Sequence, residues 1–155
     1  MAVRPPDPGT KVIEVQKVSD EKQIELAKKV RYDVFVIGQG VPAEEEIDSF
    51  EDESFHFIAY FNEMPAGAAR WRFTDNGVKL ERFAVLEDYR SKGIGSALVE
   101  AVLKDIDQHP DSANRLRYLH SQLPALKLYR KFGFKEEGPM FQECDIDHYK
   151  MIIPT

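Results

Sequence analysis

The sequence of 155 residues predicts a mixed α/β domain whose sheet is mostly antiparallel. Several short segments alternate apolar and polar residues, which is typical of strands. Asn76-Gly77 stands between two of these segments and is a hairpin signal. A helical stripe of apolar residues then separates two later strands, and such a strand–helix–strand unit is normally parallel. The length suits one domain with a substantial core.

The first half of the chain predicts one helix and four strands. Residues 12–18 alternate well enough for a strand. Ser19 and Asp20 are candidate N-caps of a helix that runs to about Val34. Residues 38–54 are acidic and contain glycine and proline, so they predict a loop with a short helix. Further strands are expected at residues 55–61, 66–73 and 78–85.

The second half begins with the most strongly patterned helix. Its apolar residues recur at the spacing of a buried stripe and are Ile94, Ala97, Leu98, Ala101 and Val102. Pro110 lies just beyond its end, and residues 116–120 predict a short strand. Pro124 suits the first turn of another helix, and Gly133 suits its C′ position. Closing strands are expected at residues 134–137 and 149–153.

Composition excludes several classes of protein. The net charge of −6 argues against general nucleic-acid binding. No apolar run approaches the ~20 residues of a membrane helix. Residues 1–10 look like a flexible lead-in without a signal peptide, which leaves residues 11–155 as the single domain. Cys144 is the only cysteine, so no intrachain disulfide is expected, and a cytoplasmic location fits. The four scattered histidines give no metal-site spacing.

Residues 90–95 read Arg-Ser-Lys-Gly-Ile-Gly at a strand-to-helix junction. Glycines allow close backbone approach, and the first turn of a helix offers unpaired N–H groups and a partial positive charge. A phosphorylated ligand is therefore expected here. The P-loop pattern is absent, and the dinucleotide pattern Gly-x-Gly-x-x-Gly fails because Leu98 replaces its third glycine.

The acidic stretch has two interpretations. Its carboxylates are Glu44, Glu45, Glu46, Asp48, Glu51, Asp52 and Glu53. They could form a solvated loop, which is the commoner case for such a run of charge. They could instead form a surface that attracts a cationic amine substrate.

Two longer segments resemble the GNAT superfamily of acyl-CoA-dependent N-acetyltransferases. Residues 79–103 contain Leu80-Glu-Arg-Phe-Ala-Val and Tyr89-Arg-Ser-Lys-Gly-Ile-Gly-Ser-Ala-Leu, and residues 116–134 end in Leu-Tyr-Arg-Lys-Phe-Gly-Phe. Residues 31–52, the pair Ala69-Arg70, and the Glu-x-x-Ile-x-His pattern within residues 141–151 resemble the ElaA-like branch. Gly38 departs from that branch, where a glutamate is expected.

The resemblance implies the GNAT fold, a mixed and mostly antiparallel central sheet with helices on both faces. It also implies transfer of an acetyl group from acetyl-CoA to a primary amine, on a small molecule or a peptide. Direct attack within a ternary complex is expected, because no cysteine or serine is an evident nucleophile. A homodimer is common in the superfamily. The alternatives are an enzyme that uses a longer acyl group and a non-catalytic acyl-CoA-binding sensor or interaction module.

By the same resemblance, the coenzyme A pyrophosphate lies on the backbone of Arg90, Ser91, Lys92, Gly93, Ile94, Gly95 and Ser96. The strand Phe83, Ala84 and Val85 pairs with the pantetheine arm, and one of its N–H groups polarises the thioester carbonyl. Tyr129 matches the general acid, since a phenol of pKa ~10 is protonated at pH 7. A core tyrosine is the alternative interpretation.

The general base has three candidates. Glu81 shares a strand face with Phe83, and partial burial could raise its pKa. It could instead be an ion-pair partner of Arg82, Arg70 or Arg72. His120, at the end of the next strand, and water are the other candidates. The branch resemblance alone suggests an acceptor pocket shaped by Arg31, Glu46, Asp48 and His148.

Overall fold

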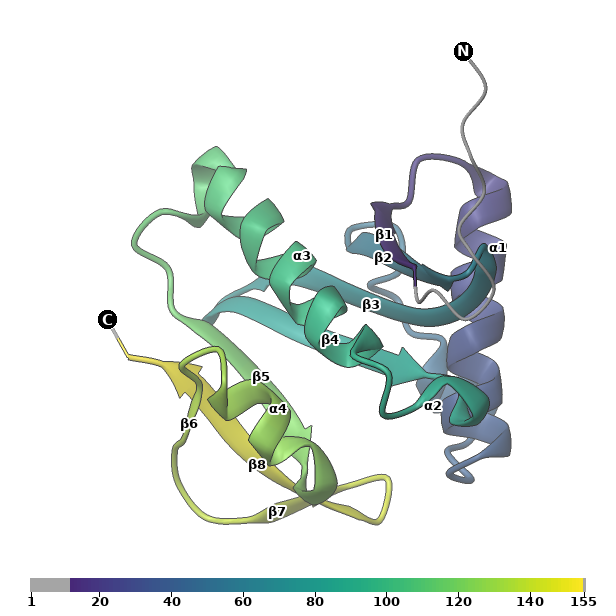
Figure 1. The fold of residues 1–155 in the computed structure, drawn as a ribbon. Coiled ribbons are helices and arrows are strands. Elements are labelled where there is room, and N and C mark those ends of the chain that lie inside the picture. Colours follow the sequence, from purple (N-terminus) through teal and green to yellow (C-terminus); the bar gives the residue numbers. More distant parts are fainter. Residues whose placement is uncertain (1–11, 155) are drawn as a thin grey trace.

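The computed structural model describes residues 12–154 and contains an eight-stranded sheet. The predicted lead-in, residues 1–10, lies outside the described residues. The strand order is β1-β2-β3-β4-β5-β8-β6, with β7 also paired to β8 (Figure 1). Among the described strands only β4 and β5 pair in parallel, so the mostly antiparallel sheet is confirmed. The strands are β1 (Ile13–Lys17), β2 (Phe55–Phe61), β3 (Met64–Thr74), β4 (Gly77–Val85), β5 (Arg117–Gln122), β6 (Lys135–Glu136), β7 (Phe141–Glu143) and β8 (Ile146–Ile153).

Helices cover both faces of this sheet, as expected. Helix α1 lies against one face of β2 to β4, and α3 crosses the opposite face (Figure 1). The helices are α1 (Glu21–Arg31), the π-helix η1 (Tyr32–Ile37), α2 (Ala43–Glu46), α3 (Ile94–Gln108) and α4 (Leu126–Arg130). In the described part of the chain, three single 3₁₀ turns complete the elements, namely η2 (Glu87–Tyr89), η3 (Pro110–Ser112) and η4 (Leu123–Ala125). No helix within residues 12–154 is long and apolar enough to cross a membrane.

Helix α1 begins at its predicted cap but ends differently. The Asp20 carboxylate accepts a hydrogen bond from the Gln23 N–H at 2.8 Å. After Arg31 the chain widens into η1, where the Gly38 N–H donates to the Asp33 carbonyl five residues back. A Cβ at position 38 would lie 2.6 Å from the Val34 carbonyl oxygen. A side chain at position 38 would therefore require the local backbone to shift.

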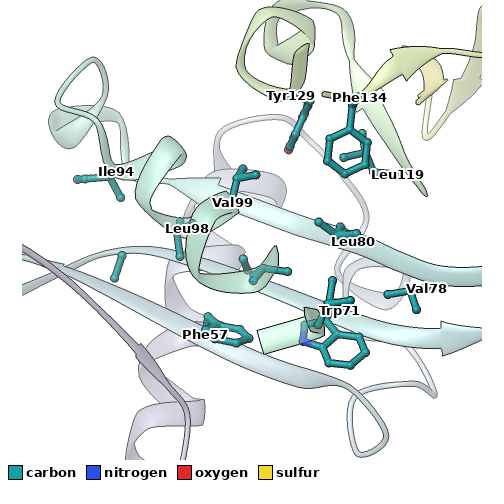
Figure 2. Close-up of a cluster of buried hydrophobic side chains, with 14 of the residues drawn as sticks. Phe57, Trp71, Val78, Leu80, Ile94, Leu98, Val99, Leu119, Tyr129 and Phe134 are labelled. Atoms are coloured by element: carbon teal, nitrogen blue, oxygen red, sulfur yellow. The ribbon is translucent and has the colours of Figure 1, made fainter. Parts of the chain in front are cut away.

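The larger core lies between the sheet and α3. Ile94, Leu98 and Val102 are fully buried as predicted, and Val99 and Ile106 join them (Figure 2). Ala97 and Ala101 are only half-buried, because the buried stripe is rotated slightly from the expected one. From the sheet Trp71 and Leu80 meet this helix, and from the second half of the chain Leu119, Tyr129 and Phe134 close the core. Burial of each large apolar side chain contributes about 1.5–3 kcal/mol.

The C-terminal part contains a hairpin that the sequence did not predict. Strands β7 and β8 are joined by Cys144-Asp145, with φ angles of +50° and +62°. Two consecutive positive φ angles are typical of a type I′ turn, which usually carries Asn-Gly or Asp-Gly. Because Cys144-Asp145 lacks that signature, the segment resembled a loop. Because Ile146 pairs with Glu143 in this hairpin, the strand predicted at residues 149–153 begins earlier, at Ile146.

The feature that positions the site is the separation of β4 from β5. They pair only over Val78–Leu80 and Arg117–Leu119. Beyond this point β4 contains a bulge, since Arg70 pairs with Glu81 whereas Ala68 pairs with Ala84. Arg82 in the bulge has a φ of +60°. The bulge bends β4 away from β5 and opens the sheet between them.

Candidate active site

A cavity of about 980 Å³ occupies the opening between β4 and β5. One wall consists of the second half of β4 and the loop that leads into α3. The opposite wall is formed by β5 and α4. Segment 34–48 and the β7–β8 turn contribute the remaining sides. Parts of the chain more than 100 residues apart in sequence therefore meet at this cavity.

The edge of β4 that faces the cavity has no strand partner within residues 12–154. Its other edge pairs with β3, where Gly67 is opposite Val85 and Ala68 opposite Ala84. Backbone groups of Phe83 to Val85 on the open edge are therefore available to an extended ligand that carries amides. One carbonyl is already engaged, since Arg90 Nε donates to the Val85 carbonyl at 3.2 Å.

The loop before α3 presents a run of backbone donors. Gly93 is the N-cap with a φ of +92°, and the first helical hydrogen bond runs from the Ala97 N–H to the Gly93 carbonyl. Within the described chain, the N–H groups of Ser91 to Ser96 have no backbone partner. Such a row at the start of a 15-residue helix fits a diphosphate group.

Two of the predicted loop residues do not line the cavity. Lys92 Nζ lies 5.4 Å from the centre of the Phe61 ring, and Ser96 Oγ accepts a hydrogen bond from Lys131 Nζ at 2.8 Å. Arg90, Ser91, Gly93, Ile94 and Gly95 all line it. Five of the seven predicted loop residues therefore lie at the cavity.

Tyr129 brings a phenol to the cavity from α4. Its ring is 7% exposed and packs edge-to-face on Phe83, with centroids 5.7 Å apart. The residue lines the cavity, and its hydroxyl has no hydrogen-bond partner within residues 12–154. Burial raises the pKa of Tyr129 above its ordinary value near 10. The phenol therefore stays protonated at neutral pH and retains a proton to donate.

Glu81 lines the same cavity but is enclosed by cations. Arg70 Nη2 lies 2.5 Å from its carboxylate, Arg72 Nε 2.9 Å and Lys79 Nζ 3.4 Å. Burial alone would raise the pKa of Glu81, but these charges outweigh it and lower the pKa below its usual value. The expected raised pKa is therefore wrong, and the ion-pair interpretation of Glu81 is correct.

Three of the seven carboxylates in the acidic stretch pair with two buried arginines. Arg31, 1% exposed, pairs with Glu46 at 2.6 Å and with Glu51 at 2.5 Å. Arg70 is fully buried and pairs with Asp48 at 2.5 Å and with Glu51 at 2.8 Å. Burial opposes ionisation of Asp48, yet its bond to Arg70 lowers its pKa to about 2. The solvated-loop interpretation is thus wrong for these three carboxylates, which fix the loop over the cavity.

Sequence reasoning missed Glu143 as a member of the site. Its carboxylate lies 2.7 Å from His120 Nδ1 and 3.9 Å from His148 Nε2, and all three residues line the cavity. The hydrogen bond from His120 lowers the pKa of Glu143 despite partial burial. The Glu-x-x-Ile-x-His pattern contained both Glu143 and His148, but only the hairpin brings its glutamate to His120.

A sequence model of the "Acetyltransferase (GNAT) domain" matches residues 18–154. This chain is a member of the GNAT acetyltransferase family. It is 40% identical over 134 residues to YjcF of Bacillus subtilis (strain 168), described as an uncharacterized N-acetyltransferase. That alignment covers 86% of this chain and 94% of YjcF. The protein is accordingly an acetyltransferase, and acetyl-CoA is its cofactor.

Solved GNAT structures share the fold at lower identity. Escherichia coli ElaA superposes with a TM-score of 0.79 at 24% identity, covering 91% of this chain and 99% of ElaA. Arabidopsis thaliana Naa50, solved with the bisubstrate analogue CoA-Ac-MVNAL, gives a TM-score of 0.68 at 23% identity and covers 92% and 99%. The GNAT fold predicted from the sequence is confirmed.

Proposed function

We propose that this GNAT acetyltransferase transfers an acetyl group to a primary amine by direct attack within a ternary complex. The observation that carries the proposal is the convergence of three features on one cavity. These are the unpaired edge of β4, the row of backbone N–H groups before α3, and the unpaired phenol of Tyr129. A donor and an acceptor can meet in the opening between β4 and β5.

Two elements of this chain would hold acetyl-CoA. The N–H groups from Ser91 to Ser96 suit its pyrophosphate, and the open edge at Phe83 to Val85 suits the amides of its pantetheine arm. When bound, acetyl-CoA supplies a thioester whose acetyl group an amine can attack. A backbone N–H on the open edge of β4 would stabilise the charge that develops on the carbonyl oxygen.

Tyr129 is proposed as the general acid. Its buried phenol would donate a proton to the leaving sulfur as the C–S bond breaks. The absence of a competing hydrogen-bond partner within residues 12–154 leaves the hydroxyl available for this donation.

The proposed role of Glu81 changes from proton acceptor to charge partner. A carboxylate with a lowered pKa and three cationic neighbours is a weak base. We propose that Glu81 instead holds Arg72 and Lys79 along the cavity wall, where both residues line the acceptor side.

Release of free thiol from acetyl-CoA with a panel of amines tests the proposal. The panel includes a polyamine, an aminosugar, a lysine-containing peptide and a peptide with a free α-amine, since Naa50 was solved with a peptide-containing analogue. Turnover with at least one amine, and none in its absence, is expected. Tight acetyl-CoA binding with no turnover for any amine would favour the sensor interpretation. A parallel series with longer acyl-CoA donors tests the remaining alternative, an enzyme that uses a longer acyl group.

A further inference from the structure

We infer that His120, held by Glu143, accepts the proton that the acceptor amine loses. This inference rests on the proposed N-acetyltransferase function and adds the base that Glu81 does not supply. His120 lies near the end of β5 and lines the cavity shared with Tyr129. Glu143 reaches it from the β7–β8 hairpin, with 2.7 Å between Oε1 and His120 Nδ1.

The contact with Glu143 determines which ring nitrogen of His120 is basic. The carboxylate of Glu143 is ionised at neutral pH, so it can only accept hydrogen bonds. His120 Nδ1 must therefore carry a hydrogen, which leaves the lone pair of the neutral ring on Nε2. His120 Nε2 has no partner within the described chain, and the side chain is 25% exposed. A basic nitrogen is thus oriented by a carboxylate and remains accessible.

Two other side chains at the cavity that could accept a proton, Glu81 and His148, are already engaged. The Glu81 carboxylate is surrounded by Arg70, Arg72 and Lys79. His148 Nδ1 donates to the Ile146 carbonyl at 2.7 Å, and its side chain is only 9% exposed. Its ring stacks on Phe141, with centroids 5.9 Å apart. These contacts indicate that His148 stabilises the hairpin that carries Glu143.

The surroundings of His120 fix the ring from several sides. Phe141 meets it edge-to-face at 5.0 Å, and Tyr118 lies 6.0 Å away on the same strand. The charged or titratable groups that face this cluster are Glu143 from β7, His148 and Lys150 from β8, and Lys79 from β4. Lys150 is paired with Glu137 at 3.2 Å, so Glu143 is the charge in direct contact with His120.

In the proposed step, two bonds change and two protons move. The amine nitrogen forms a bond to the acetyl carbon, and its N–H proton passes to His120 Nε2. The C–S bond breaks, and the phenol proton of Tyr129 passes to sulfur. The resulting imidazolium is stabilised by Glu143, and proton exchange with solvent restores both side chains. Glu143 exchanges no proton in this step and acts through His120, so it is a positioning residue.

The test compares His120→Gln and Glu143→Gln with the wild-type enzyme, using the best amine of the panel. We expect His120→Gln to lower kcat by about 100-fold or more, with acetyl-CoA affinity unchanged by calorimetry. Added imidazole should restore part of the rate in His120→Gly. His109→Gln is the matched control, because His109 does not line this cavity and should leave the rate unchanged.

A second readout addresses positioning by Glu143. Nitrogen NMR of the wild-type protein should show hydrogen on His120 Nδ1 and none on Nε2 near neutral pH. Glu143→Gln should populate the other tautomer and lower kcat while leaving acetyl-CoA affinity intact. A wild-type enzyme that turns over an amine while His120→Gln keeps full rate would overturn this inference alone. The opposite tautomer in the wild type would also overturn it. No turnover by the wild type with any amine would overturn the proposed function as well.

Discussion

Arg70 and Glu81 face each other across the β3–β4 pairing and form a buried ion pair, with 2.5 Å between Nη2 and Oε2. The same arginine holds Asp48 and Glu51 of the acidic stretch. One side chain therefore links β4 at the cavity to the acidic stretch, of which Asp48 also lines the cavity. This link explains why Glu81, although placed in the cavity, is suited to structure rather than to proton transfer.

Replacing Arg70 should destabilise the fold strongly. Arg70→Met leaves three carboxylates without their central partner, and breaking a buried pair in this way costs about 3–5 kcal/mol. Urea unfolding followed by circular dichroism measures the change. Arg130→Met is the matched control, because it breaks an exposed pair with Glu136 and should shift the midpoint little. Equal effects of the two variants would contradict the central role of Arg70.

Stability should fall in two stages as the pH is lowered. Burial lowers the pKa of His56, so protonation favours the unfolded chain once the pH drops below about 6.5. The pKa values of Asp48, Glu51 and Glu81 are also lowered in the folded state, so the stability they contribute is present above the unfolded pKa values of about 3.9–4.3 and is lost as the pH falls below them.

His56→Gln isolates the first stage of this acid response. Each proton taken up only by the unfolded state reduces the free energy of unfolding by up to about 1.4 kcal/mol per pH unit. The variant should lack this loss just below pH 6.5 and keep the later one. Urea titrations at a series of pH values measure both. Parallel curves for the two proteins would rule out His56 as the source.

Gly95→Asp should abolish acetyl-CoA binding and leave the fold intact. A carboxylate at the start of α3 would repel the pyrophosphate from the N–H groups that receive it. A Cβ at this position meets only the Leu128 side chain, at 3.2 Å. Gly95→Ala adds the same Cβ without charge and should lose much less affinity by calorimetry. Unchanged affinity in Gly95→Asp would refute this placement of the cofactor.

Tyr129→Phe should separate catalysis from stability. The hydroxyl makes no hydrogen bond within residues 12–154, so the melting temperature should not change. The rate with the best amine should fall by about 100-fold or more, because the leaving sulfur loses its proton donor. Tyr118→Phe is the converse control. It breaks a 2.6 Å bond to Thr74 Oγ1 away from the cavity, so it should lose about 1 kcal/mol of stability and keep full rate.

Local patterns in the sequence predicted much of the framework. Residues 55–61 form β2 over the expected range, Asp20 caps α1, and Ile94 and Leu98 mark the buried face of α3. These features depend on periodicity and capping, which act between residues close together in the chain. The π-helix was missed because it has no common residue signature, and the β7–β8 hairpin was missed because Cys144-Asp145 is not a usual turn sequence.

The sequence by itself identified the GNAT motifs, the loop at residues 90–96 whose backbone N–H groups suit a phosphate, and the candidate acid Tyr129. Each of these features belongs to one continuous segment. Only the tertiary structure decided the electrostatics of the site. In the folded protein, three cations on β3 and β4 surround Glu81. Glu143 lies beside His120, although His120 is 23 residues earlier in the chain. The ionisation of a side chain depends on charges and burial contributed by distant segments, which no local pattern contains.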